Sequence, residues 1–226
     1  MTGSQPELHV SDDPAGPFAR LIADRAAEGG SIVLTGGSAT RAYTRAAALE
    51  PDWGRVDLWW GDERCVSPDD ERSNFRAARE TLLDHLEDPP REVHRIRGEL
   101  QPADAAGELD RELDGVQLDL VLLGLGPDGH VASLFPHSPQ LAVEDRRATS
   151  GPAGLDPYVD RVTMTMPTLR SARLIALLVT GADKAEAVSR AVQGAITEDI
   201  PASLLRLGSA PIHVYLDEAA ASELSR

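Results

Sequence analysis

An aspartate and a histidine stand in the glycine-rich stretch GLGPDGHVASLFP (124–136), directly after the apolar run LDLVLL (118–123). Glycines let the backbone approach a ligand closely, so such a turn can also be a binding site. We expect His130 to begin a short helix, whose N-terminus keeps an imidazole neutral, as a general base must be. Asp128 is expected to fix either the loop or the imidazole. The pair predicts acid–base catalysis; the alternative is a purely structural turn.

The same glycines match the G-x-G-x-x-G pattern of dinucleotide-binding proteins, and Glu144 and Asp145 lie about where a ribose-binding acid would be. That pattern requires a crossover helix after the third glycine, whereas HVASLF ends at Pro136 and is too short to cross a sheet. Asp128 would also direct its negative charge at the pyrophosphate. Dinucleotide binding is therefore the weaker interpretation.

A second glycine turn, TGGS (35–38), offers the backbone N–H groups of Gly36 and Gly37 and the Ser38 hydroxyl to a phosphate. It is not a P-loop, because no G-K-[ST] follows, and it is not a nucleophile elbow, because Thr40 stands where that motif needs glycine. An ordinary capped helix explains the turn equally well.

Two further loops carry charge. In GDER (61–64), Asp62 can bind sugar hydroxyls and Arg64 an anion, although a surface salt bridge is an equal alternative. Lys184 is the only lysine, since 21 of the 22 basic residues are arginine. A compact ammonium group in the first turn of an expected helix suits a single phosphate or carboxylate. The alternative is that this position is a matter of chance.

Neither a metal nor a cofactor is predicted. Asp128, His130 and His137 are the one ligand combination considered, and the chain has no H-E-x-x-H motif, no cysteine pair and no acidic triplet with ligand spacing. The adjacent Trp59 and Trp60 must face opposite sides of a strand, which indicates packing for both.

Continuous apolar runs alternate with helical patterns along the chain. We expect strands at 31–37, 55–64, 91–96, 118–126, 162–167, 173–181 and 212–217, and helices at 38–50, 73–86, 102–115, 182–192 and 217–225. Such runs predict an α/β fold with a mostly parallel open sheet and helices on both faces, Rossmann-like, in which ligands bind beyond the carboxyl ends of the strands. We predict a single domain over 1–226, with 1–17 poorly ordered or peripheral.

The overall composition excludes several classes of partner. A formal net charge of −15 and a pI near 4.7 disfavour nucleic acid and anionic membrane, and no apolar run is long enough to span a bilayer. A single cysteine, Cys65, fits a reducing compartment. The polar, acidic N-terminus does not resemble a signal peptide. We therefore expect a cytoplasmic protein.

Taken together, the motifs resemble the 6-phosphogluconolactonase family, which is related to the glucosamine-6-phosphate deaminases and has a NagB/RpiA-type fold. The resemblance rests on LTGGS (34–38), WWGDERCV (59–66), SNFRAARETLL (73–83), DLVLLGLGPDGHVASLFP (119–136), 161–188 and IPASLLR (200–206). These pieces follow the family's order over nearly the whole chain. One departure is Ala39-Thr40, where the family usually has Thr-Pro.

This resemblance implies hydrolysis of 6-phospho-D-glucono-1,5-lactone to 6-phosphogluconate in the oxidative pentose phosphate pathway. His130 would be the base, assisted by Asp128, and backbone N–H groups of 124–130, Gly126 among them, would face the oxyanion. A metal ion, a cofactor and a covalent nucleophile are not required. The 6-phosphate is expected among Gly37, Ser38, Arg161 and Lys184, next to Gly36, with Asp62, Arg64 and Arg76 at the ring or carboxylate end. We expect a monomer or a weak homodimer.

Two rival functions are weighed against this one. The deaminases of the sister family carry a glutamate five residues after the motif histidine, and this chain has Phe135 there. A non-catalytic sugar-phosphate sensor would need a DNA-binding or partner module, for which an acidic chain of this length has no room.

Overall fold

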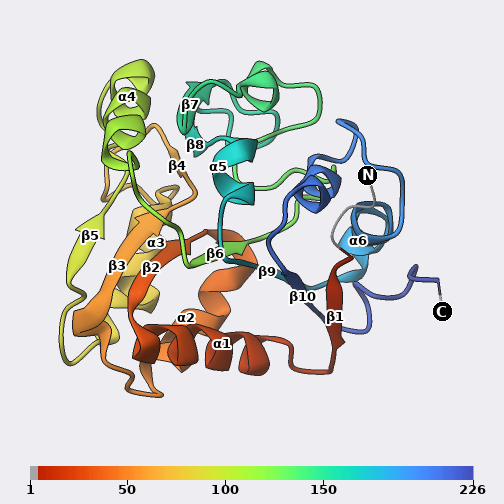
Figure 1. Cartoon of the computed structure of the whole chain (residues 1–226), viewed down its shortest axis with the longest axis horizontal. Coiled ribbons are helices and arrows are strands. Elements are labelled where there is room, and N and C mark those ends of the chain that lie inside the picture. Colours follow the sequence, from red (N-terminus) through yellow and green to blue (C-terminus); the bar gives the residue numbers. More distant parts are fainter. Residues whose placement is uncertain (1–4, 226) are drawn as a thin grey trace.

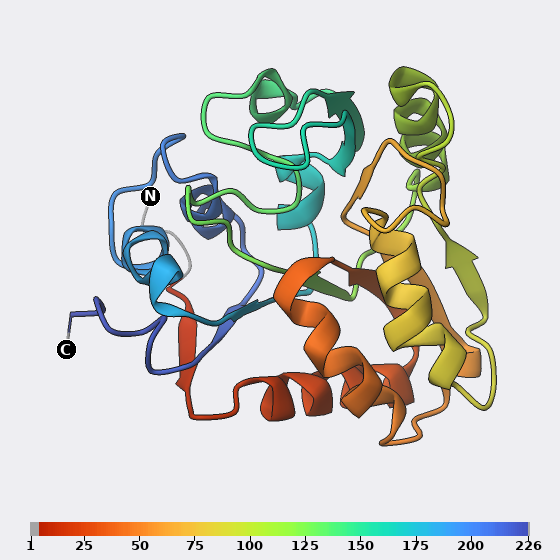
Figure 2. The ribbon, with the colours of Figure 1, turned by 180° about the vertical axis from the view of Figure 1, so that it is seen from behind.

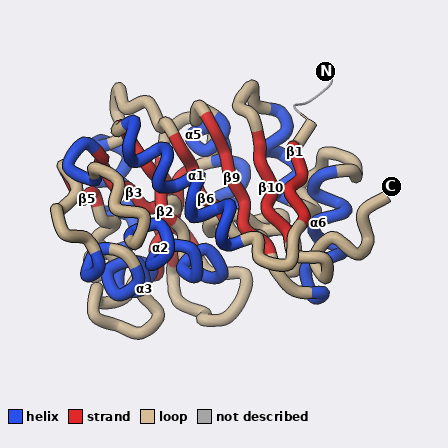
Figure 3. The backbone as a smooth tube through the Cα atoms, turned by 90° about the horizontal axis from the view of Figure 1, so that it is seen from below, coloured by secondary structure: helices blue, strands red, loops and turns tan. Residues whose placement is uncertain are grey.

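The protein is built around a seven-stranded sheet in which every pair of neighbouring strands is parallel. The computed structural model describes residues 5–225. The strand order is β1-β10-β9-β6-β2-β3-β5 (Figures 1 and 3). The strands are β1 (Glu7–Val10), β10 (Ile212–Leu216), β9 (Leu174–Val179), β6 (Leu120–Leu123), β2 (Gly30–Leu34), β3 (Val56–Trp60) and β5 (Glu92–His94).

The central strands read as continuous apolar runs because both of their faces are covered. All four residues of β6, and all but the first residue of β2 and of β9, are buried. A strand with one solvated face would instead alternate apolar and polar residues. The prediction of a mostly parallel α/β sheet with helices on both faces is confirmed.

Helices cover both faces of this sheet. On one face α1, α2 and α3 pack against one another, and α4, α5 and a small second sheet lie on the other, as Figures 1 and 2 show. The helices are α1 (Ala15–Glu28), α2 (Thr40–Ala47), α3 (Asn74–Thr81), α4 (Pro102–Glu112), α5 (Met166–Arg170) and α6 (Ala185–Val192). No helix among residues 5–225 is both long and apolar enough to cross a membrane.

The second sheet corrects one sequence-based expectation, that 55–64 is a single strand. It is antiparallel, with the order β4-β8-β7, and comprises β4 (Asp62–Arg64), β8 (Arg161–Met164) and β7 (Ala148–Gly151). The run 55–64 is therefore two strands in different sheets. Gly61 lies at the break: its N–H donates to Leu34 O in β2, and its carbonyl accepts from the Met164 N–H in β8.

Both ends of the chain differ from the expected elements. Within the segment 1–17, residues 1–4 lie outside the described residues, 7–10 form the edge strand β1, and α1 begins at Ala15. The helix α1, which the sequence analysis did not assign, buries Phe18 and Ile22 in the core. The helix expected at 217–225 is absent, because these residues form turns.

The sheet order brings three loops together. The chain moves outward from β2 in both directions, through β3 on one side and β6 on the other, so the strand order reverses at β2. Such a reversal opens a crevice beyond the carboxyl ends of the strands. The loops after β2, β6 and β9 all leave the sheet at this edge.

Candidate active site

A cavity of about 340 Å³ lies at the crevice and is lined by the loops that carry the predicted site residues. Nine of the eleven residues predicted for the site line it, and the two exceptions are Asp128 and Arg76. The lining comprises 35–38, Asp62, Arg64, Asn74, 124–127, His130, Ala132, Ser133, Phe135, Leu155, Asp156, Arg161, Val179, Thr180 and Lys184. Leu155 and Asp156, which the sequence analysis did not select, are among these lining residues.

Asp128 lies next to His130 and holds both its ring and its backbone. The Asp128 Oδ1 atom is 2.5 Å from His130 Nδ1 and accepts the His130 backbone N–H at 3.2 Å. The alternatives of fixing the loop and fixing the imidazole are therefore both realised. The helix expected at His130 is absent: residues 127–135 form turns with an isolated bridge between Val131 and Leu134. A carboxylate, rather than a helix terminus, orients this imidazole.

The charge of Asp128 determines which ring nitrogen is available to the cavity. Burial raises the pKa of Asp128, but the hydrogen bonds and charge of His130 outweigh it, and the net pKa lies below the usual range. The carboxylate is therefore ionised at neutral pH and can only accept hydrogen bonds. The proton of a neutral His130 ring must then be on Nδ1, which leaves the Nε2 lone pair free to take a proton.

Gly126 is required by this arrangement. A Cβ atom at Gly126 would overlap the His130 ring and press on Asp128 Oδ1. Three N–H groups of the loop are already committed within it, because Gly126 donates to His130 O, Gly129 to Gly126 O, and His130 to Asp128. These bonds hold the turn in place. The three N–H groups that make them were among the expected oxyanion donors and are not available for that role.

The loop after β2 is anchored from several sides. The Tyr43 hydroxyl accepts from Thr35 N–H and donates to Thr35 O, and Ser38 Oγ donates to Leu178 O in β9 at 3.0 Å. Gly37 has a φ of +66°, which favours glycine. Thr40, at the departure from the family pattern, donates its hydroxyl to Gly37 O at 2.8 Å. The substituted residue therefore stabilises the turn.

Asp62 is buried and held by two residues that the sequence analysis did not select. Ser133 Oγ donates to Asp62 Oδ2 at 2.6 Å, and Asn74 Nδ2 lies 3.3 Å from Oδ1 and 2.9 Å from the Asp62 carbonyl. Asn74 also crowds Gly36, where a Cβ atom would overlap the amide oxygen. Two features of the sequence could have indicated these residues: Asn74 stands at the start of an expected helix, and Ser133 lies within DGHVASLFP.

Glu63 organises the segment around Asp62 without lining the cavity. Its buried carboxylate accepts backbone N–H groups from Arg64, Asn74 and Phe75 and the hydroxyl of Ser73. Burial raises the pKa of Glu63, while these four donors act in the opposite direction. The carboxylate thus joins β4 to the first turn of α3 and fixes Asp62 on one side and Asn74 on the other.

Arg64 and Arg161 form the cationic wall of the cavity. They are register partners in the antiparallel β4–β8 pair. Arg161 is 3% exposed, and its Nη2 atom donates to Pro157 O at 2.8 Å. Arg64 Nε, Arg161 Nε and Arg161 Nη1 are buried without a hydrogen-bond partner among residues 5–225. Burial and the neighbouring Arg64 charge lower the pKa of Arg161.

Lys184 contributes a third positive charge from another element. It ends the short 3₁₀ turn Ala182–Lys184 that precedes α6, as expected from its place after a strand. Its Nζ atom lies 3.6 Å from Asp183, and the side chain is 22% exposed. Lys184 and His130 line the same cavity although they follow different strands.

Arg76 is not brought to the cavity. It points along α3, where its Nε donates to Glu80 at 2.7 Å and its Nη1 donates to Asp69 O at 2.8 Å. His137, the third member of the metal combination considered from the sequence, lies 2.8 Å from Asp199 instead of joining His130. Burial raises the pKa of Cys65 to about 11, so this thiol is protonated at neutral pH and unsuited to nucleophilic attack.

Comparisons with known proteins show the family to which this chain is related. A family profile described as "Glucosamine-6-phosphate isomerases/6-phosphogluconolactonase" matches residues 11–214. A 6-phosphogluconolactonase of Streptomyces coelicolor is 36% identical over 241 residues, covering 97% of this chain and 92% of the relative. One from Mycobacterium tuberculosis is 36% identical over 190 residues, covering 76% of each chain.

Solved structures show the same fold. The 6-phosphogluconolactonase of Trypanosoma brucei superposes with a TM-score of 0.86 at 27% identity, covering 98% of this chain and 100% of that one. A monomeric glucosamine-6-phosphate deaminase of the NagB superfamily superposes with a TM-score of 0.86 at 23% identity and shares the fold. By its profile match and its relatives, this chain belongs to the glucosamine-6-phosphate isomerase/6-phosphogluconolactonase family.

Proposed function

We propose that this protein hydrolyses 6-phospho-D-glucono-1,5-lactone to 6-phosphogluconate, in the oxidative pentose phosphate pathway. The observation that carries the proposal is one cavity with the free face of His130 and the cationic groups of Lys184, Arg64 and Arg161 on its walls. A phosphorylated lactone needs a base at its carbonyl and positive charge at its phosphate. The relatives named as 6-phosphogluconolactonases support the same substrate.

In the proposed reaction His130 activates water. The water oxygen attacks C1 of the lactone while His130 Nε2 takes one of its protons. Asp128 stabilises the imidazolium ion through Nδ1. The tetrahedral intermediate then collapses, the bond from C1 to the ring oxygen breaks, and His130 returns the proton to that oxygen. The products are a carboxylic acid, which ionises in water, and a free hydroxyl group on the sugar chain.

Binding of the substrate follows from the charges along the wall. We assign the 6-phosphate to Lys184, Arg161 and the N–H groups of the turn 36–38, because Ser38 already donates its hydroxyl proton to Leu178 O. Arg64 adjoins Arg161 and, with Asp62, faces the sugar. For the oxyanion we propose the cavity-lining segment of Gly124 and Leu125, since other N–H groups of that loop are committed. Arg76, which is paired elsewhere, has no part in this assignment.

Phe135 favours lactone hydrolysis over deamination. Its ring lines the cavity and lies 4.6 Å from the His130 ring, at an angle of 45°. Deamination with ring opening needs an acid–base relay, and a phenyl ring cannot transfer protons. Phe135 therefore places an apolar ring, and no proton-transferring group, beside His130.

We place the reaction in the cytoplasm and assign it to a monomer or weak homodimer. The test is a coupled assay in which glucose-6-phosphate dehydrogenase generates the lactone and acid release is followed with and without this protein. Hydrolysis faster than the spontaneous rate is expected, without release of ammonia from glucosamine 6-phosphate. An unchanged lactone lifetime, or ammonia release, would contradict the proposal.

A further inference from the structure

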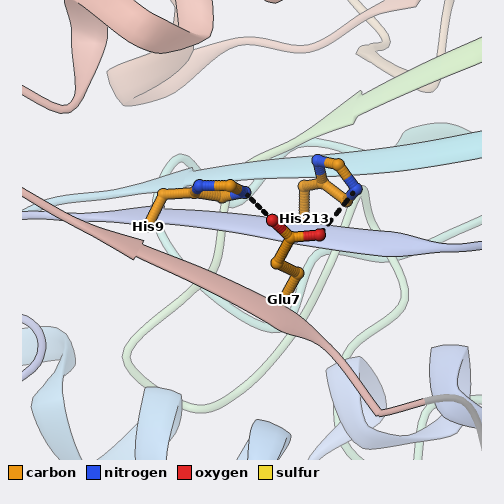
Figure 4. A group of neighbouring side chains, drawn as sticks. All are labelled: Glu7, His9 and His213. Atoms are coloured by element: carbon orange, nitrogen blue, oxygen red, sulfur yellow. Dashed lines mark ion pairs between the residues drawn. The ribbon is translucent and has the colours of Figure 1, made fainter.

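Three metal-ligating side chains meet at the edge of the main sheet, away from the cavity lining. Glu7 and His9 alternate on β1 and therefore face the same side, and His213 is the register partner of Glu7 on β10. Figure 4 shows the Glu7 carboxylate between the two imidazole rings. Among residues 5–225, no other three His, Cys, Asp or Glu residues bring their ligand atoms within 4.8 Å of one another.

The spacing of these atoms matches a metal coordination shell. His9 Nε2 lies 3.4 Å from Glu7 Oε1, and His213 Nε2 lies 3.5 Å from Glu7 Oε2. Zinc binds imidazole nitrogen and carboxylate oxygen at about 2.0–2.2 Å, and neighbouring ligands of a tetrahedron around it are then about 3.4 Å apart. One ligand atom of each of the three residues lies within 4.8 Å of the other two, so the side chains must draw together to share one ion.

A second observation comes from His9 itself. Its Nε2 atom is buried and, although Glu7 Oε1 lies 3.4 Å away, it makes no hydrogen bond in the described part of the chain. Buried polar atoms nearly always have a partner, so this nitrogen calls for one. The ring is held in place by stacking on Tyr215, with centroids 4.6 Å apart and an interplanar angle of 14°. A metal ion bound by His9 and His213 would give this nitrogen a partner.

The donor set selects the class of ion. Two imidazole nitrogens and one carboxylate oxygen suit zinc and similar divalent transition metals, whereas magnesium and calcium require shells made of oxygen. We propose that Glu7, His9 and His213 bind one zinc-class ion, with water as the fourth ligand, and that the ion fastens β1 to β10. This site is separate from catalysis, because none of the three residues lines the active cavity.

The consequence concerns the stability of the sheet edge. β1 has four residues and pairs with β10 alone, and such short edge strands open readily. An ion bound to both strands would hold β1 in place. Its ligands come from opposite ends of the chain, so no short spacing pattern in the sequence marks them.

Binding is tested with the untagged, chelator-treated full chain and zinc chloride, by isothermal titration calorimetry and by competition with a chromogenic chelator. We expect one equivalent of zinc whose affinity falls about 100-fold or more in His9→Ala and in His213→Ala, since even an orienting partner is worth about 10–100-fold. His85→Ala is the matched control, because His85 contacts only a backbone carbonyl. His130→Ala must retain this equivalent, which distinguishes the edge site from the active cavity.

Zinc should also slow amide hydrogen exchange in β1 of the parent protein and leave it unchanged in His9→Ala, while both proteins keep the same lactone hydrolysis. Should a histidine variant fail to fold by circular dichroism, anomalous diffraction at the zinc edge on parent crystals decides, with a peak expected between Glu7, His9 and His213. Absence of zinc binding, binding unaffected by both substitutions, or an anomalous peak elsewhere only would overturn the proposal.

Discussion

Arg64 and Arg161 face each other across the β4–β8 pair, so two guanidinium groups share one wall of the cavity. The two positive charges repel each other, and burial adds to the free-energy cost of keeping both guanidinium groups charged. Three of their nitrogen atoms nonetheless have no hydrogen-bond partner within residues 5–225. Such an arrangement is suited to an anionic ligand, which would neutralise both groups and fill the open donor positions.

Replacing Arg161 by methionine should weaken substrate binding without destabilising the fold. A hydrogen bond to a charged group is worth about 1.5–3 kcal/mol, so we expect KM to rise about 10–100-fold. Removal of a buried charge next to Arg64 should leave the melting temperature unchanged or raise it. Steady-state kinetics and thermal unfolding measure the two effects. The control is Arg146→Met, at an exposed arginine paired with Asp145; equal effects in both variants would contradict the assignment.

Replacing His130 by alanine should abolish most turnover and leave binding largely intact. Loss of a general base typically lowers kcat about 10²–10⁴-fold. The coupled lactone assay gives kcat, and calorimetric titration with 6-phosphogluconate gives the affinity. His85→Ala serves as the control at an exposed histidine. A His130→Ala enzyme with parental kcat would show that another group activates the water.

Asp128→Asn should lower kcat about 10²–10⁴-fold, because a neutral amide neither fixes the His130 tautomer nor stabilises the imidazolium ion. The substitution also carries a pH signature. Since the folded pKa of Asp128 lies below that of the unfolded chain, its charge stabilises the fold above about pH 4, and acid removes this contribution.

The difference in free energy of unfolding between the parent and Asp128→Asn should therefore be largest near neutral pH and vanish as the pH falls below the folded pKa. Urea denaturation at a series of pH values measures it. A difference that stays constant across the acid range would mean that the Asp128–His130 pair does not contribute in this way.

Two glycine-to-alanine substitutions should affect different properties: one lowers kcat, and the other raises the free energy of unfolding. In Gly126→Ala the new methyl group overlaps His130, so kcat should fall at least tenfold, about 1.4 kcal/mol in the barrier. Gly107 lies within α4 with open space at its Cβ position, so Gly107→Ala should stabilise the fold by roughly 0.5–1 kcal/mol and leave kcat unchanged. Kinetics and urea denaturation compare the two; a fully active Gly126→Ala enzyme would refute the steric argument.

The amino-acid sequence by itself determined the features that depend on near neighbours in the chain. Apolar runs such as LVLL (120–123) specify buried strands, glycines permit the tight turn before His130, and the spacing of Asp128 and His130 allows their contact. These properties follow from backbone conformation and side-chain period, which act over a few residues. The parallel sheet and nine of the residues that line the cavity could therefore be predicted.

Only the tertiary structure decided which of these residues meet. Strand order placed Lys184 and His130 on one cavity, and the pairing of β4 with β8 set Arg161 beside Arg64. Arg76 differs from these residues, because it pairs with Glu80 four positions further along α3, a local contact that helical spacing allows. Strand pairing depends on contacts between segments that are far apart in the sequence. It therefore decides which charged side chains become neighbours. Local sequence patterns do not specify this pairing of strands.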